Sequence, residues 1–111
     1  MTTVTIRHQG GKIAGFSAKG HTGYAEEGED IVCAAVSAIT QTAMMGLKRF
    51  APDTRARWRE GDAPLLEVEV PHPTRETEVI LTTMVIGLED ILSGVPQYVR
   101  ILHTGSEVES K

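Results

Sequence analysis

The sequence of 111 residues is 41% hydrophobic and 23% charged, which is ordinary for a folded protein and excludes a disordered or disulfide-stapled chain. We expect a single domain over residues 1–111. The formal net charge of −4 argues against a surface that follows nucleic-acid phosphates, so we expect no direct nucleic-acid partner.

The single cysteine, Cys33, cannot form an internal disulfide, and this favours a cytoplasmic protein. The first residues lack the basic and apolar segments of a targeting signal, and no uninterrupted apolar run reaches the length of a membrane span. We therefore expect neither secretion nor membrane insertion.

The chain opens with two stretches in which apolar and polar residues alternate, residues 4–8 and 14–18, with two glycines between them. This pattern predicts a β-hairpin. Residues 20–30 contain three glycines and have no apolar period, which predicts a mobile loop.

A long helix is predicted over residues 31–50, where apolar residues recur at steps of three and four. Asp30 is the expected N-cap of this helix, and Pro52 ends it. The expected buried stripe consists of Val32, Val36, Ile39, Ala43, Leu47 and Phe50.

The second half of the chain predicts a further hairpin, a helix and a strand. Residues 55–59 and 66–70 alternate as two strands that set arginines beside glutamates across one face. Thr74 is expected to cap the helix, and Gly94 and Pro96 to end it. A last strand is expected over residues 98–102. The apolar stripe of this helix consists of Leu81, Met84, Val85, Leu88 and Leu92.

The order of the predicted elements is ββαββαβ. Two amphipathic helices and five short strands in this order predict an α+β two-layer sandwich. We expect a mixed five-stranded sheet with both helices on one face.

Cys33 is the candidate nucleophile. With Asp30 as N-cap it would be the third helical residue, where free N–H groups and the helix dipole favour a thiolate and can stabilise an oxyanion. His21 is the candidate base that takes the thiol proton and later protonates a leaving amine. Spacing alone leaves a structural role open, because lone cysteines at helix starts are commonly packing residues.

Other residues near Cys33 have two explanations each. Asp30 is first a cap and second a residue that orients His21. Gly20, Gly23 and Ser37 are candidates for lining the site, although turn formation and close helix packing explain them as well.

The sequence predicts no metal site and no cofactor, because no tight pair of ligands occurs. The residue types that bind metals are present only as scattered side chains. These are His8, His21, His72, His103, Cys33 and Asp30.

The central block of the chain resembles a known family. Gly20-His21-Thr22-Gly23-Tyr24-Ala25, then Gly28, then Asp30-Ile31-Val32-Cys33-Ala34-Ala35-Val36-Ser37 closely resemble the ribosomal-processing cysteine proteases, the Prp family. The predicted order of strands and helices agrees with this family along nearly the whole chain.

The resemblance implies a cysteine endopeptidase that removes an N-terminal extension from a bacterial large-subunit ribosomal protein. It also implies a homodimer, and it matches the family's histidine and cysteine to His21 and Cys33. The loop between them differs from the family in its acidity, since it contains Glu26, Glu27 and Glu29. Basic residues beside the substrate's cleavage site would suit this loop.

Two other functions remain open. A non-catalytic ribosome-associated module would use Arg55, Arg57 and Arg59 to contact RNA, although Glu67 and Glu69 weaken this hypothesis. A thiol redox sensor would use the cysteine without a general base. Replacement of the histidine separates the protease from the sensor.

Overall fold

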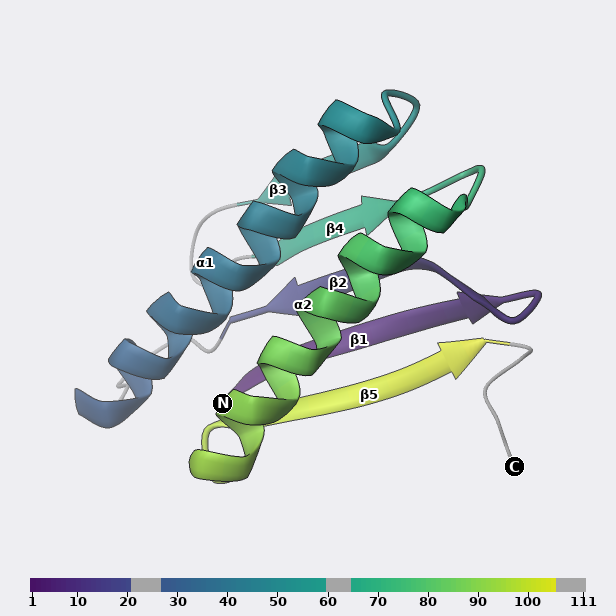
Figure 1. Cartoon of the computed structure of the whole chain (residues 1–111). Helices are drawn as coiled ribbons and strands as arrows, with labels where there is room; N and C mark the ends of the chain where they lie inside the picture. Colours follow the sequence, from purple (N-terminus) through teal and green to yellow (C-terminus); the bar gives the residue numbers. More distant parts are fainter. Residues whose placement is uncertain (21–26, 60–64, 106–111) are drawn as a thin grey trace.

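The computed structural model describes residues 1–20, 27–59 and 65–105, with the side chains of residues 27–30 excepted. Five strands and two helices follow one another in the order ββαββαβ (Figure 1). They are β1 (Thr2–Gln9), β2 (Lys12–Lys19), α1 (Glu27–Phe50), β3 (Arg55–Arg59), β4 (Leu65–Glu69), α2 (Arg75–Gly94) and β5 (Val99–Gly105).

The strands form one mixed sheet in the order β3-β4-β2-β1-β5, and both helices cover the same face (Figure 1). Neighbouring strands are antiparallel except β1 and β5, which are parallel. The predicted α+β two-layer sandwich is therefore confirmed.

The core lies between the sheet and the two helices. Alternate strand residues such as Val4, Ile6 and Val68 point into it and are buried. Leu47 of α1 and Leu81 of α2 are fully buried against them. Burial of these side chains from both layers holds the helices on the sheet, since each contributes about 1.5–3 kcal/mol.

Helix α1 begins at Glu27, so the predicted start and the predicted N-cap are both wrong. Asp30 lies inside the first turn, and Cys33 lies in the second. Gly28 also lies in the first turn, and a glycine in a segment without an apolar period is why the sequence pattern indicated a loop here.

The predicted apolar stripes are largely buried, with one exception. Phe50 is 63% exposed, so its assignment to the buried stripe of α1 is wrong. It lies at the edge of the stripe that faces α2, and it lines a surface groove between the helices together with Val79 and Ile80.

The start of α2 follows the prediction. Thr74 is the N-cap, and its side-chain oxygen accepts a hydrogen bond from the Thr77 backbone N–H at 3.2 Å. The Thr77 hydroxyl in turn accepts from the Thr74 N–H at 2.8 Å. This reciprocal pair satisfies two of the N–H groups that a helix start leaves unpaired.

One described segment is long and apolar enough to cross a membrane, Ile31–Phe50, with a mean hydropathy of 1.4. This is weak evidence for a span, because the core helix of a soluble protein meets the same criterion. Val32, Val36 and Leu47 from this segment pack into the core.

A histidine pair links β1 to β5. His8 Nε2 lies 2.8 Å from His103 Nδ1, so one ring donates a hydrogen bond to the other. Burial, together with His103, lowers the pKa of His8 below its usual value, and the Glu78 carboxylate opposes this shift.

We predict that this histidine makes the fold sensitive to mild acid. Its lowered pKa means that the unfolded chain binds the proton more readily, so stability is complete above about pH 7 and declines as pH falls through about 6.5. Urea unfolding at pH 7.5 and pH 5.5 measures the effect, and His8→Gln should reduce the difference between the two pH values. An identical pH dependence in the variant would contradict the assignment.

Candidate active site

Cys33 faces the sheet from the second turn of α1. Its side chain is partly exposed, and its Sγ lies 3.0 Å from Oγ1 of the buried Thr2. Thr2 is the first residue of β1, and its N–H donates a hydrogen bond to the Tyr98 carbonyl. The strand start therefore places a fixed hydroxyl beside the sulfur.

The thiol lines a small pocket between α1 and the ends of several strands. Its volume of about 120 Å³ is smaller than an ordinary small-molecule site of about 300–1,000 Å³, which suits a single side chain or a short segment of chain. The lining residues are Thr2, Ala18, Gly20, Cys33, Val36, Ser37, Thr40, Gln41, Trp58, Leu65 and Leu66.

The structure brings together part of the predicted site. Gly20 and Ser37 line the same pocket as Cys33. His21 and Gly23 lie outside the described residues. The Asp30 backbone is in the first turn of α1, and its side chain is not among those described.

The observed helix start changes the expected electrostatics of the site. The dipole's influence is concentrated in the first turn, which Cys33 has left. Cys33 is the seventh helical residue, and an amide at this position has a carbonyl partner four residues earlier. The Cys33 N–H is therefore not one of the free N–H groups that we expected to stabilise an oxyanion.

The sequence analysis missed eight of the lining residues, among them Thr2, Gln41 and Trp58. Gln41 had a detectable signal, because it lies eight residues after Cys33 and so shares its helix face. Thr2 and Trp58 had none, since only the pairing of distant strands brings them to α1.

Two histidine contacts lie away from this pocket. His72 Nδ1 is 2.7 Å from the Asp53 carboxylate, and hydrogen bonding to His72 lowers the pKa of Asp53. The pair formed by His8 and His103 is the other. In the described part of the chain, no three His, Cys, Asp or Glu side chains form a group suited to a metal ion.

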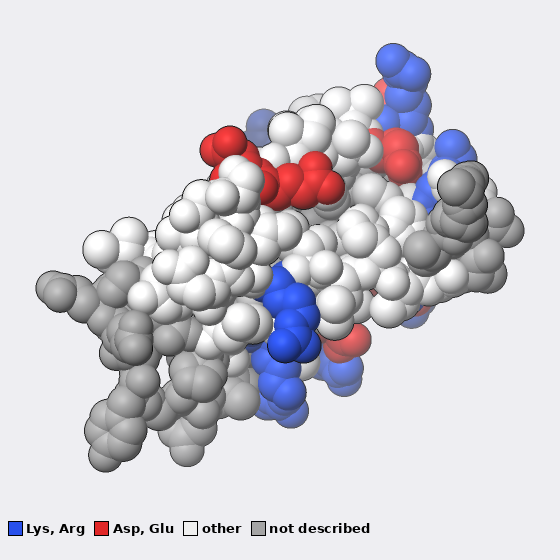
Figure 2. All heavy atoms as spheres, turned by 90° about the horizontal axis from the view of Figure 1, so that it is seen from below, with Lys and Arg blue, Asp and Glu red and all other residues white. Residues whose placement is uncertain are grey.

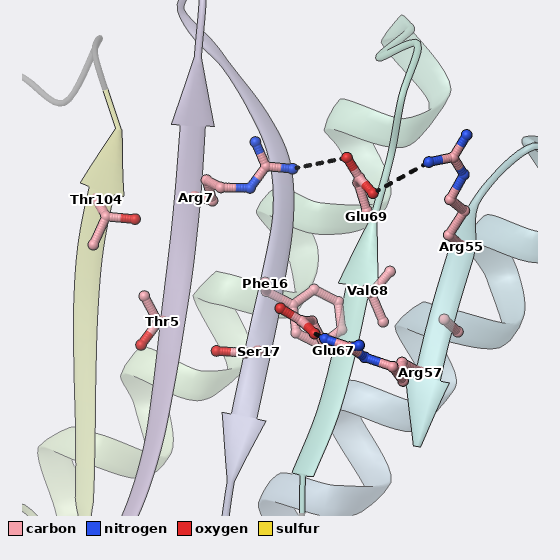
Figure 3. A pocket seen from close by; sticks show the side chains of 11 residues that line it. Thr5, Arg7, Phe16, Ser17, Arg55, Arg57, Glu67, Val68, Glu69 and Thr104 are labelled. Atoms are coloured by element: carbon pink, nitrogen blue, oxygen red, sulfur yellow. Dashed lines mark hydrogen bonds and ion pairs between the residues drawn. The ribbon is translucent and has the colours of Figure 1, made fainter. Parts of the chain in front are cut away.

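A larger cavity of about 630 Å³ lies on the sheet face opposite the helices (Figure 3). Charged side chains such as Arg57 and Glu67 line it, with Ser17 and Thr104. None of its lining residues is a thiol or an imidazole. The smaller pocket is the better candidate for catalysis, because it holds the thiol.

A free, partly exposed thiol in a pocket is a feature expected of a small enzyme with a thiol nucleophile. The family model described as cysteine protease Prp matches residues 1–100. A ribosomal processing cysteine protease Prp of Mycoplasma pneumoniae is 30% identical over 99 residues, covering 89% of this chain and 91% of that protein. The chain belongs to the Prp family and is a cysteine protease.

Relatives and solved structures agree with this assignment. The Staphylococcus aureus ribosomal processing cysteine protease Prp is 30% identical over 105 residues, which cover 91% of this chain and 97% of that protein. The crystal structure of an essential ribosomal processing protease Prp from S. aureus with a substrate peptide has a TM-score of 0.76 and 25% identity, covering 94% and 100% of the two chains. SMU.848 from Streptococcus mutans shares the fold, with a TM-score of 0.82, 22% identity and 96% of each chain covered.

We predict that the Thr2 hydroxyl supports the reactive thiolate. Thr2→Val keeps the side-chain shape but removes the donor 3.0 Å from the sulfur, and loss of such a bond to a charged group costs about 1.5–3 kcal/mol. Peptide cleavage should therefore slow about tenfold or more. Thr2→Ser, which keeps the hydroxyl, is the matched control, and an unchanged rate in Thr2→Val would refute this role.

Proposed function

We propose that this protease removes an N-terminal extension from a bacterial large-subunit ribosomal protein, with Cys33 and His21 as its catalytic pair. The observation that carries the proposal is the partly exposed Cys33 thiol in a pocket lined by Gly20, the residue directly before His21. Relatives with the processing activity in their names span nearly the whole chain. We take residues 1–111 as one catalytic domain in the cytoplasm.

The pocket supports acyl transfer through a thioester. His21 takes the proton of the Cys33 thiol, and the sulfur attacks the scissile carbonyl carbon. The tetrahedral intermediate collapses, the C–N bond breaks, and His21 returns the proton to the leaving amine. Water then hydrolyses the thioester that holds the N-terminal fragment, which regenerates the thiol.

The acidic residues before and within the first turn of α1 suit a basic substrate. Glu27, Glu29 and Asp30 belong to the same helix as the nucleophile, and Glu26 precedes them. Ribosomal proteins are generally rich in lysine and arginine, so we expect basic residues beside the cleaved bond.

The catalytic pair predicts a clear pattern among variants. Cys33→Ala should retain the fold, since it removes one sulfur from a partly exposed position, and should abolish cleavage of the extended precursor. His21→Ala should also abolish cleavage, because the thiol then lacks its base. Intact mass of the precursor before and after incubation measures the result.

Ser37→Ala is the matched control, since Ser37 lines the same pocket and has no assigned step. Cleavage by Cys33→Ala would overturn the proposal. Cleavage by His21→Ala would overturn the role of His21 as base. No cleavage by the wild type, with normal thiol oxidation in both the wild type and His21→Ala, would favour a redox sensor, which needs no base.

We further propose that two copies of the chain pair through their helical faces. A groove of about 570 Å³ lies between α1 and α2, and its lining is almost entirely apolar. The exposed apolar side chains Phe50 and Val79 stand in it, 63% and 52% exposed. A contiguous apolar surface of this kind is typical of a protein interface.

The dimer predicts a change in molecular mass on substitution. Light scattering should give twice the chain mass of 12.0 kDa for the wild type and 12.0 kDa for Phe50→Glu combined with Val79→Glu. Leu102→Glu on the opposite sheet face is the matched control and should remain dimeric. A wild type of single-chain mass at working concentrations would exclude this pairing.

A further inference from the structure

The helices leave one face of the sheet free (Figure 1). The side chains of this face are mostly basic, although the whole chain is acidic. The strand register sorts alternate residues to this free face. Among the described strand residues, seven basic and two acidic side chains point there. They are Arg7, Lys12, Lys19, Arg55, Arg57, Arg59 and Arg100, against Glu67 and Glu69.

The two carboxylates are already paired within the face, at one end of the sheet (Figure 3). Glu67 forms an ion pair with Arg57. Glu69 lies 3.7 Å from Arg55 and 3.9 Å from Arg7, so two arginines share one carboxylate. The predicted pairing of arginines with glutamates across this hairpin is thereby confirmed.

Three of the remaining basic residues, Lys19, Arg59 and Arg100, form a row across the other end of the sheet. The row follows paired residues of the five neighbouring strands. In strand order these are Arg59 of β3, Leu65 of β4, Lys19 of β2, Thr3 of β1 and Arg100 of β5. All three basic residues are exposed, and none has an ion pair with another described residue. With strands about 4.8 Å apart, the row spans roughly 19 Å.

The composition of the row favours phosphate over a protein surface. Protein interfaces are built around buried aromatic side chains, and none of the described strand residues on this face is aromatic. Lysine and arginine without stacking residues are the usual contacts to a nucleic-acid backbone, which they bind without reading bases.

We propose that Lys19, Arg59 and Arg100 form a docking row for the phosphate backbone of RNA. The three basic residues can each contact a phosphate oxygen of an RNA backbone laid along the row. Binding is electrostatic and independent of base sequence. RNA binding does not require the protease activity. Because the row lies on the free sheet face, bound RNA leaves the Cys33 pocket under the helix layer accessible.

The whole-chain charge concealed this row. Figure 2 shows basic side chains at the lower margin, on the side of the sheet, and also at the upper right, whereas most acidic side chains in view lie near the upper margin. Acidic residues on α2, including Glu89 and Asp90, contribute to the net charge of −4 but lie in the other layer. We based the expectation of no nucleic-acid partner on the net charge of the whole chain. The charge of this one face leads to the opposite expectation.

The test measures fluorescence anisotropy of a labelled 20-nucleotide RNA of mixed sequence. The wild type should bind with a dissociation constant of roughly 1–100 µM near physiological salt. With three contacts, the logarithm of affinity should fall against that of salt concentration with a slope of about −2 to −3. A variant with Lys19→Glu, Arg59→Glu and Arg100→Glu should bind at least about tenfold more weakly.

The matched control is Lys48→Glu with Arg49→Glu and Arg75→Glu, three exposed basic residues of the helical layer. It changes the net charge equally, so it should bind at least fivefold more tightly than the row variant. Absence of wild-type binding at 50 mM salt, or equal loss in both variants, would overturn the proposal.

Two further arms identify the partner. Unlabelled RNA should displace the probe at concentrations at which polyglutamate of equal charge does not, and equal displacement by polyglutamate would overturn the assignment to RNA. If the triple row variant does not unfold cooperatively, it is not properly folded and cannot test binding. The RNA affinities of the single variants Arg59→Glu and Arg100→Glu are then each compared with that of Arg49→Glu. Equal affinities in that comparison would also count against the row.

Discussion

The site depends on the packing of one face of α1 against the sheet. Val32 and Val36 are buried in the core, and Cys33 lies between them on the helix. Their burial fixes the rotation of α1, so the thiol meets Thr2 at the start of β1. A rotation of α1 about its axis by one residue, about 100°, would move the sulfur out of the pocket. It would also expose to solvent an apolar side chain that is now buried in the core.

Most of the fold was predictable because its elements have clear periods. Apolar residues alternate over residues 4–8 and 14–18 and recur at steps of three and four in the helices. These periods indicate which face each element buries. Thr74 was identified as a cap for a local reason, the chemistry of its side chain. The start of α1 was missed because Gly28 lies in its first turn, where the sequence has no apolar period. Phe50 was misplaced because period alone does not distinguish the core from a groove at the stripe's edge.

The candidate site was predictable only in part. Cys33 and Ser37 share a helix face, and Gly20 precedes the matched histidine, so local sequence indicated them. Thr2 and Trp58 reach the pocket through the strand order β3-β4-β2-β1-β5, which no local pattern encodes. The same pairing gathers Lys19, Arg59 and Arg100 into one row from three separate strands. Both the pocket and the basic row are therefore products of sheet topology.

The proposed mechanism requires a covalent bond between Cys33 and the N-terminal part of the substrate. The direct measurement is rapid acid quenching of the wild-type enzyme with its precursor, followed by intact mass and peptide mapping. We expect an enzyme that is heavier by the mass of the released fragment minus one water, with the added mass on the peptide that contains Cys33. An adduct on another residue during turnover of the precursor would contradict this mechanism. The absence of any adduct, under conditions in which the thioester forms faster than water hydrolyses it, would contradict it as well.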